Sequence, residues 1–417
     1  MLERRIGVRG AVVIGLSSMV GAGLFYVWAP AAAVAGPWLL VGLAIAATVA
    51  TLNALSSAQL AMAYPVSGGA YSFGRASLGP WWGFSAGWLF LAGKTASAAA
   101  IALIAAGYLL PEYARVLAVV FIATLAVVNA SGIRSTARIS AIIVFVVLIG
   151  LGAILAVSAL GSGRGTGLGA SAAPFSAVSG NGWYGTLQSA GLLFFAFAGY
   201  ARMATLGEEV RNPRRSLPIA IGVALGIALL VYGTVAAMLV GTLGIDRLAV
   251  TASPLLELVK GIGGGTGLGW ATLVQLLAAL ACLGSLVGIL AGLSRTSLAM
   301  ARGGDLPGYL GRISPTRSSP VAAEATMAGL AMLGVLVLDA TQLVGFSACA
   351  VLVYYAIANV AALRQPAAGR WLPRWVQILG LIGCLVLAVT LPWRGVLIAA
   401  LVLAAGLILR AWRQRAR

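Results

Sequence analysis

Gly15-Leu-Ser-Ser-Met-Val-Gly-Ala-Gly-Leu-Phe-Tyr-Val-Trp28, within the first apolar segment, decides how the rest of the chain is interpreted. Its serine pair and its glycines at 21 and 23 have weak helix propensity. A membrane helix that breaks here exposes main-chain N–H groups at bilayer depth, which is tolerated only where they line a cavity. The N-terminus of the half-helix that follows would attract an anion such as a carboxylate. A packing patch of small residues between continuous helices is the alternative interpretation.

The composition is that of a helical membrane protein. Of the 417 residues, 61% are hydrophobic and only 9% are charged, and the mean hydropathy is +1.02. Apolar runs of about 18 residues or more recur along the chain, and runs of that length predict membrane-spanning helices. We therefore expect an all-α polytopic membrane protein with twelve spans, near residues 10–34, 38–62, 81–110, 115–130, 134–160, 184–204, 217–243, 270–300, 321–338, 341–363, 374–391 and 394–411.

The basic residues indicate how the spans are oriented. The net charge is +18, and most of the 27 Lys and Arg residues fall in alternate short loops. Because cytoplasmic loops carry an excess of Lys and Arg, this pattern predicts a multi-pass protein of the cell (plasma or inner) membrane with both termini in the cytoplasm. The Arg-rich tail after Leu409 suits an anionic membrane surface, so membrane lipid, and not nucleic acid, is the expected partner of this charge. The oligomeric state is left open.

Side chains on which enzymes and metal sites depend are missing or dispersed. The chain has no histidine, and its three cysteines lie far apart in apolar segments, which favours buried thiols over disulfides or metal ligands. We therefore predict no catalytic residue, no metal site and no cofactor, and a protein that is not an enzyme. A membrane-embedded enzyme would need a nucleophile–base pair at a common depth. A channel would need a continuous polar stripe along several spans. Neither pattern is visible.

A second interrupted segment occurs half a chain later. In residues 192–213, Gly199 lies in the middle of the apolar run and polar residues begin at Arg202. This segment opens a second set of five spans, as residues 10–34 open the first set. An odd number of spans gives the two sets opposite orientations in the membrane. Paired glycine-interrupted segments in inverted halves are typical of a transporter with its binding site near the bilayer midplane.

This pairing predicts the domain organisation. Residues 1–160 form the first inverted repeat, 161–183 an external linker, 184–364 the second repeat, and 365–417 the peripheral spans eleven and twelve with the basic tail. Residues 248–262 are too short to span a membrane and predict a short external helix. Residues 64–71, Tyr-Pro-Val-Ser-Gly-Gly-Ala-Tyr, predict a turn-rich cytoplasmic link between spans two and three.

Several motifs in this order resemble the amino acid–polyamine–organocation (APC) transporter superfamily. They are Gly21-Ala-Gly-Leu-Phe25, residues 64–71, Phe195-Ala-Phe-Ala-Gly199 with Glu208-Glu-Val-Arg-Asn-Pro213, residues 294–307 and, more weakly, Tyr354-Tyr-Ala-Ile-Ala-Asn359. Each motif alone is modest, but together they cover spans one to ten. The resemblance implies a 5+5 inverted-repeat fold of the leucine-transporter type, with spans one and six unwound.

The resemblance also implies where a substrate binds. Members of the superfamily hold the main-chain groups of an amino acid at the two breaks. The N–H groups of Ala22 and Gly23 would bind the carboxylate, and the carbonyls of Met19, Phe195 and Ala198 would accept the α-ammonium. A half-helix N-terminus suits an anion and a half-helix C-terminus suits a cation. The implied substrate-binding residues, all at or beside a break, are Met19, Gly21, Ala22, Gly23, Phe195, Ala198 and Gly199.

Gate candidates lie on span six. Phe195 would cover the substrate as an aromatic gate, although a phenylalanine at this spacing is also ordinary packing. Glu208 and Glu209 are followed by arginines at 211, 214 and 215. We interpret this group as an ion-pair network at the cytoplasmic end of the span and as part of an inner gate.

The distribution of acidic residues bears on the substrate. All nine acidic residues fall at span ends or in loops, whereas a site for Arg, Lys or polyamines would want a fixed anion or stacking aromatic rings. We therefore expect a secondary active transporter of small or medium neutral L-amino acids, which works by alternating access and is coupled to protons. An exchanger or exporter without proton coupling, and a cationic amino-acid or polyamine carrier, stay open as alternatives.

Lys94 is the candidate for proton coupling. It lies about thirteen residues into span three, roughly 20 Å along a helix and so near the middle of the membrane. An ionisable residue at this depth is a functional candidate by default. The alternative is a lysine that hydrogen-bonds carbonyls of neighbouring broken helices and exchanges no proton. Some proton-coupled members of the superfamily carry a lysine on span five. The corresponding position in this chain falls near Val147, where there is no lysine, so the chain departs from the route of proton coupling that uses that lysine.

Overall fold

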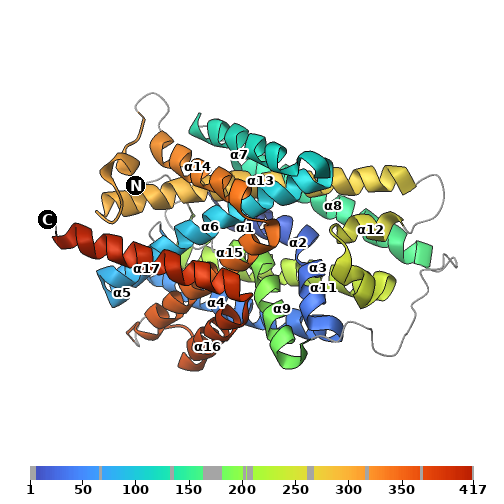
Figure 1. Cartoon of the computed structure of the whole chain (residues 1–417). Coiled ribbons are helices and arrows are strands. Elements are labelled where there is room, and N and C mark those ends of the chain that lie inside the picture. The colour runs from blue at the N-terminus through green and yellow to red at the C-terminus, as the bar shows by residue number, and fades with distance from the viewer. Residues whose placement is uncertain are drawn as a thin grey trace.

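The fold is a bundle of α-helices (Figure 1). The computed structural model describes residues 6–64, 68–131, 136–162, 181–200, 203, 210–260, 267–314, 319–366 and 370–415. Within these ranges the only β pairing is an isolated bridge between Ile6 and Val210. Nine helical segments of the described chain are long and apolar enough to cross a membrane, and two further apolar helices are shorter. The predicted all-α polytopic fold is confirmed.

The helices of the first half follow the predicted spans, with one addition. They are α1 (Val8–Met19), α2 (Ala22–Tyr26), α3 (Trp28–Ala35), η1 (Gly36–Trp38), α4 (Leu39–Ala63), α5 (Ala70–Leu78), α6 (Pro80–Leu109), η2 (Pro111–Tyr113), α7 (Ala114–Ala130) and α8 (Thr136–Ser162). The prediction of a turn-rich link over 64–71 missed α5. The chain turns at Gly68 and Gly69, which have positive φ, and α5 then buries Tyr71 and Phe73 against the bundle.

The second half likewise contains a helix for each predicted span. The elements are α9 (Gly182–Phe197), η3 (Ala198–Tyr200), α11 (Pro213–Val250), α12 (Pro254–Lys260), α13 (Gly267–Arg302), η4 (Gly308–Gly311), α14 (Val321–Val337), α15 (Ala340–Leu363), α16 (Arg374–Thr390) and α17 (Trp393–Arg415). α11 is longer than predicted and kinks at Gly244, where φ is 70°. α12 is the short helix expected within 248–262. Most of the linker at 161–183 lies outside the described residues.

The break in the first span lies where the sequence predicts it. α1 ends at Met19, and Val20 and Gly21 leave helical geometry with ψ of 77° and −145°. The helix resumes at Ala22 and continues through Val27, which keeps helical φ and ψ, to the end of α3. Gly36, with φ of 54°, and the proline after it end this half-helix. The first span is therefore two helices separated by a short extended segment.

The broken spans lie inside the bundle. α1 packs against α11, α8 and η3, and α9 packs against α3 and α4, while α6 runs along α13 and α15. In Figure 1 the marks for the two chain ends lie at the same end of the bundle. The three cysteines, Cys282, Cys349 and Cys384, are free and buried, as predicted. The division into two inverted repeats stays a prediction.

Candidate functional site

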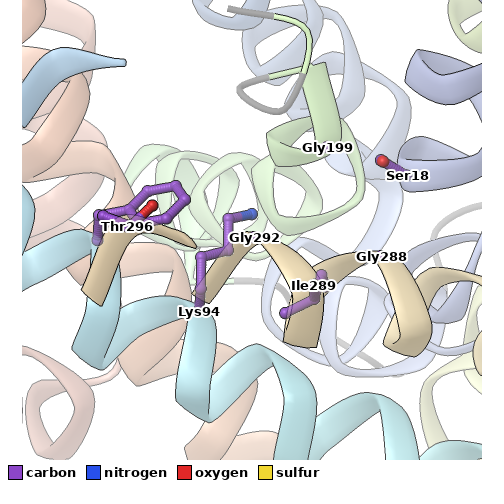
Figure 2. Close-up of a pocket in the computed structure, with 8 residues that line it drawn as sticks. Ser18, Lys94, Gly199, Gly288, Ile289, Gly292 and Thr296 are labelled. Atoms are coloured by element: carbon purple, nitrogen blue, oxygen red, sulfur yellow. The ribbon is translucent and has the colours of Figure 1, made fainter. Parts of the chain in front are cut away.

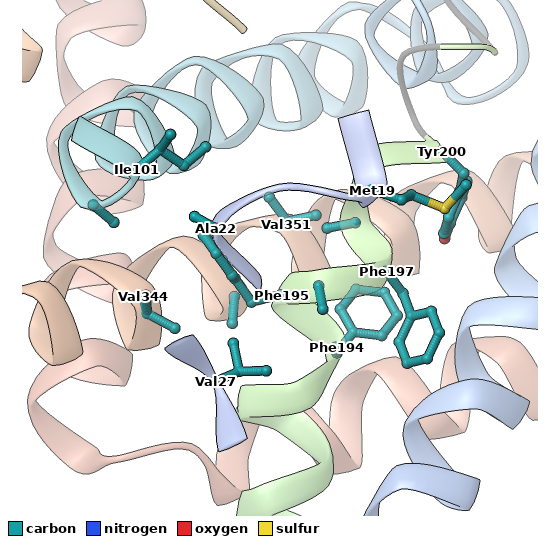
Figure 3. Packing of buried hydrophobic residues seen from close by; sticks show 14 of the residues in the cluster. Met19, Ala22, Val27, Ile101, Phe194, Phe195, Phe197, Tyr200, Val344 and Val351 are labelled. Carbon is teal, nitrogen blue, oxygen red and sulfur yellow. The ribbon is translucent and has the colours of Figure 1, made fainter. Parts of the chain in front are cut away.

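The break in span one and the second break, which is the end of α9 where the helix passes into η3, lie at main-chain distance from each other. A Cβ added to Gly23 would lie 2.5 Å from the Cα of Ala196, so α2 and α9 approach as closely as glycine allows. A Cβ added to Gly199 would lie 2.7 Å from the main-chain nitrogen of Met19. Figure 3 shows the extended segment between Met19 and Ala22 beside the helix that carries Phe195. The glycines predicted to bind substrate thus also let the two breaks touch.

Tyr232 of α11 links the two breaks. Its hydroxyl is shared between the carbonyl of Met19, at 2.7 Å, and the carbonyl of Ala196, at 3.0 Å. The side chain is fully buried and packs edge-on against Phe197. A helix that breaks leaves carbonyls without intrahelical partners, and such groups need donors from outside the helix. Tyr232 is not among the residues predicted from the sequence, where its only signal is a hydroxyl within an apolar span.

Two further hydroxyls support the first break. Ser285 of α13 donates to the carbonyl of Ser17 at 2.8 Å, and Tyr108 of α6 donates to the carbonyl of Phe25 at 2.8 Å. Ser285 also abuts Gly21, because a Cβ on that glycine would clash with its hydroxyl. The break in span one is therefore held from both sides by neighbouring helices.

A cavity lies where the breaks meet. Its empty space, open solvent included, is about 310 Å³, and its lining consists mainly of glycines, small side chains and a few larger apolar ones. Of the described residues that line it, Lys94 is the only charged one. The lining residues are Ser18, Met19, Gly21, Ala22, Gly23, Lys94, Ser97, Ile101, Phe195, Ala196, Gly199, Ser285 and Ile289. Such a cavity offers polar main-chain groups from both breaks.

The structure brings most of the predicted site residues together. Six of the seven predicted substrate-binding residues line this cavity. The seventh, Ala198, accepts a hydrogen bond at its carbonyl from Lys94, which does line it. The Met19 carbonyl accepts hydrogen bonds from Tyr232 and from the Gly21 N–H, at 2.9 Å, so both its lone pairs are occupied in this conformation. The gate candidates Glu208 and Glu209 lie outside the described residues.

Lys94 lies at the centre of the site. It occupies the middle of the 30-residue helix α6 and is 8% exposed. Its ammonium donates to the carbonyl of Ala198 at 3.2 Å. Figure 2 shows the side chain directed from α6 toward the turn that carries Gly199. Lys94 therefore already holds the carbonyl that the resemblance assigns to a substrate ammonium. This hydrogen bond is the kind of contact expected of a lysine that bonds a carbonyl of a broken helix, the alternative interpretation of Lys94. Proton exchange by Lys94 stays a prediction.

A second cavity adjoins the first and shares Lys94, Ser18, Gly199 and Ile289 with it. Its empty space, open solvent included, is about 440 Å³. It follows one face of α13, where the additional lining residues are Gly288, Gly292 and Thr296, with Phe90 of α6 opposite. It extends toward the end of α13. Arg413 of α17 donates to the Leu306 carbonyl just beyond α13, at 3.5 Å, so this is the end of the bundle at which α17 also ends. The two cavities together lead from the breaks toward that end.

An ion-pair network around Asp305 connects the helices at this end of the bundle. Asp305, which is buried, lies 3.0 Å from Arg75 of α5 and 2.8 Å from Arg410 of α17. The hydroxyl of Tyr71 donates to the same carboxylate at 3.0 Å. Burial, and then the negative charge of Asp305, raise the pKa of Tyr71 to about 12. Arg410 also lies over the rings of Trp81 and Phe84. The network joins α5, α17 and the segment after α13.

Comparison with known proteins identifies the family. The sequence profile of the amino acid permease family matches residues 6–406. An uncharacterized transporter of Mycobacterium tuberculosis is 48% identical over 406 residues, which are 97% of this chain and 90% of that protein. The chain is also similar to the branched-chain amino acid permease of Bacillus subtilis (26% identity, 77% of this chain and 72% of the permease) and to human cationic amino acid transporter 4 (28% identity, 85% and 58%). The chain therefore belongs to the amino acid permease family, within the APC superfamily that its motifs resemble.

Proposed function

We propose that this permease is a secondary active transporter of small or medium neutral L-amino acids that works by alternating access and is coupled to protons. The observation that carries the proposal is the cavity between the two breaks, which offers a helix start on one side and a helix end on the other. These ends have opposite partial charges. A zwitterion carries a carboxylate and an ammonium a few ångströms apart and complements both.

The carboxylate is assigned to the start of α2. Ala22 and Gly23 are the first residues of a half-helix that continues to Ala35, and N–H groups in a first helical turn have no intrahelical partner. Both residues line the cavity. Gly21 precedes them, and because it has no Cβ the chain at this position can lie directly against the Ser285 hydroxyl. This arrangement supports main-chain binding of a carboxylate, which every amino acid shares.

The ammonium is assigned to the end of α9. The carbonyl of Ala198 already accepts a hydrogen bond from the amine of Lys94, which supports the suitability of this position for a substrate ammonium. The carbonyl of Phe195 is the second acceptor in the proposal. The carbonyl of Met19 joins them only if the Tyr232 hydroxyl gives way, because that hydroxyl now occupies it.

Gating and orientation complete the proposal. Phe195 lines the cavity and is 8% exposed, which suits an aromatic gate over the substrate. Glu208 and Glu209 are retained as the proposed inner gate. We place both termini in the cytoplasm and the protein in the cell membrane, because both chain ends lie at one end of the bundle and the basic loops follow the positive-inside rule. The second cavity then leads toward the cytoplasm.

Neutral substrates are favoured by the absence of a carboxylate among the described residues that line the cavities. One observation favours a second candidate, a carrier of cationic amino acids, because a relative over most of this chain is named a cationic amino acid transporter. The branched-chain permease among the relatives points to neutral substrates instead. Exchange or export without proton coupling is the alternative for the energetics.

Uptake by proteoliposomes tests the proposal. A labelled panel of neutral and cationic amino acids is offered with and without an imposed pH gradient, to the parent protein and to Lys94→Met. We expect the gradient to drive uptake of neutral amino acids by the parent and not by the variant. Uptake that requires internal amino acid and ignores the gradient would replace proton coupling by exchange. Preferential uptake of arginine or lysine would replace the neutral substrate class.

A further inference from the structure

We propose that Lys94 sets the charge selectivity of this site: its ammonium, which donates to the Ala198 carbonyl, gives the cavity a positive charge that tolerates zwitterionic amino acids and excludes those with a cationic side chain. The inference rests on the proposed function, because it concerns which amino acids the same cavity accepts. It goes further in assigning the exclusion to one residue. The relatives leave the question open, since their names cover branched-chain and cationic amino acids.

Packing fixes where Lys94 points. Its neighbour Gly93 faces α15 so closely that a Cβ there would lie 2.9 Å from the Cβ of Ala350. One turn along α6, the hydroxyl of Ser97 lies 2.6 Å from the hydroxyl of Ser347, also on α15. These contacts set the rotation of α6 about its axis. The Lys94 side chain is thereby directed to the end of α9, where its ammonium contacts Ala198.

Among the residues that the structure describes, no carboxylate lines either cavity to balance this charge. Lys94 is the only charged residue among the described ones that line them. Of the buried acids in the described chain, Asp305 is paired with Arg75 and Arg410, and Glu324 accepts a hydrogen bond from Asn129 at 3.1 Å. The partial negative charge at a helix C-terminus offsets only about half an elementary charge. The cavity therefore has a positive potential.

This potential distinguishes amino acids by side-chain charge. A zwitterion adds no net charge, because the repulsion between its α-ammonium and Lys94 is offset by the attraction of its carboxylate, at Ala22 and Gly23, to Lys94. A cationic side chain adds a second positive charge to the same cavity. Two unit charges about 6 Å apart at an effective dielectric constant of about 20 repel each other enough to weaken binding roughly 100-fold. A polyamine, which has no carboxylate, is disfavoured more strongly.

A purely supporting role for Lys94 leads to a different result. If the side chain only braces the end of α9, its replacement would weaken the binding of every amino acid by a similar factor. The ratio between a cationic substrate and a neutral one of the same shape would then stay constant. That ratio is therefore the quantity to measure.

Competition against the equilibrium binding of a labelled neutral amino acid provides the ratio, because binding can be measured in a variant that does not transport. Ornithine and norleucine match in side-chain length and differ in a terminal ammonium or methyl group. For the parent at neutral pH, we expect the inhibition constant of ornithine to exceed that of norleucine by roughly 100-fold. In Lys94→Met the ratio should fall to within a few-fold of unity, and in Lys94→Arg it should stay high. A parent ratio near one, or an unchanged ratio in Lys94→Met, would overturn the proposal.

Lys94→Gln keeps the measurement decisive if the methionine variant does not fold. Glutamine still donates a hydrogen bond to a carbonyl but carries no charge, so the ratio should also fall. A ratio that stays high in Lys94→Gln would assign the effect to the hydrogen bond and contradict the proposal. Uptake of norleucine by the parent separates the two hypotheses. Its absence refutes the proposed function, whereas norleucine uptake with a constant ratio refutes only the role of Lys94.

Discussion

Replacing Gly23 by alanine tests whether the two breaks must touch. In the structure an added Cβ would lie 2.5 Å from the Cα and 2.6 Å from the Cβ of Ala196, whereas ordinary contacts lie at 3.4–4 Å. The nearest atom belongs to the main chain of α9 and cannot rotate away. α2 and α9 must therefore separate by about 1 Å, which strains the segment that carries Val20 and Gly21.

The magnitude follows from two opposing terms. Overpacking of a buried contact costs about 1–3 kcal/mol, and a main-chain contact belongs at the upper end. Alanine gains about 1 kcal/mol over glycine from helix propensity. We expect a net loss of about 2 kcal/mol in Gly23→Ala. Gly226 provides the matched control, because it lies in α11 with nothing within 4 Å of an added Cβ. Gly226→Ala should be neutral or stabilising by up to about 1 kcal/mol.

The assay compares both variants with the parent in the same detergent and at the same heating rate. Apparent melting temperature reports stability, and binding of a labelled neutral amino acid reports the site. We expect Gly23→Ala to melt several degrees below Gly226→Ala and to lose binding, since its shift moves the N–H groups assigned to the carboxylate. If the two variants melt together and bind alike, the close approach of α2 and α9 does not matter, and the reasoning is wrong.

Three further outcomes are expected. Tyr232→Phe removes the hydroxyl shared by two break carbonyls and should lower stability by about 1–3 kcal/mol in thermal unfolding, whereas Tyr113→Phe at an exposed tyrosine should not. Asp305→Asn leaves the buried Arg410 without its counter-charge and should lower the free energy of unfolding by about 3 kcal/mol or more in the same assay. A smaller loss would show that the ion-pair network contributes little to stability. Hydrogen bonding to Arg247 lowers the pKa of Glu257 below its ordinary value of 4.5. The stability that this ion pair adds to the fold is therefore present above pH 4.5 and is lost as the pH falls through the lowered pKa. A melting series against pH should show a loss of under about 1 kcal/mol, absent in Glu257→Gln.

The sequence alone predicts the class and the order of the helices well. Long apolar runs in the membrane have little alternative to helix, so composition suffices for the all-α fold. The break at Val20 and Gly21 was also predictable, because weak helix formers interrupt an otherwise apolar run. The errors are local. α5 was missed because the glycine-rich turn at 68–69 hid the helix that begins one residue later.

The partners of the breaks were less predictable. Tyr232 bonds a carbonyl 213 residues away and Ser285 bonds one 268 residues away. Such pairs depend on which helices lie side by side, and the periodicity of a single sequence carries no such information. Lys94 illustrates the difference. Its depth followed from its position in span three, but its contact with Ala198, 104 residues away, depends on how α6 packs on α15 and faces α9.

The physics of a broken membrane helix nevertheless restricts where these partners can come from. Carbonyls released at a break have no water to bind in the bilayer, so each needs a donor from a neighbouring helix or from a ligand. Here the described donors from neighbouring helices are three hydroxyls, those of Tyr232, Ser285 and Tyr108, and one amine, that of Lys94. A hydroxyl is a neutral donor and adds no charge to the cavity, whereas the Lys94 ammonium adds a positive charge. The hydroxyls therefore hold the breaks without adding charge, and Lys94 is the donor whose contact a second cation would oppose.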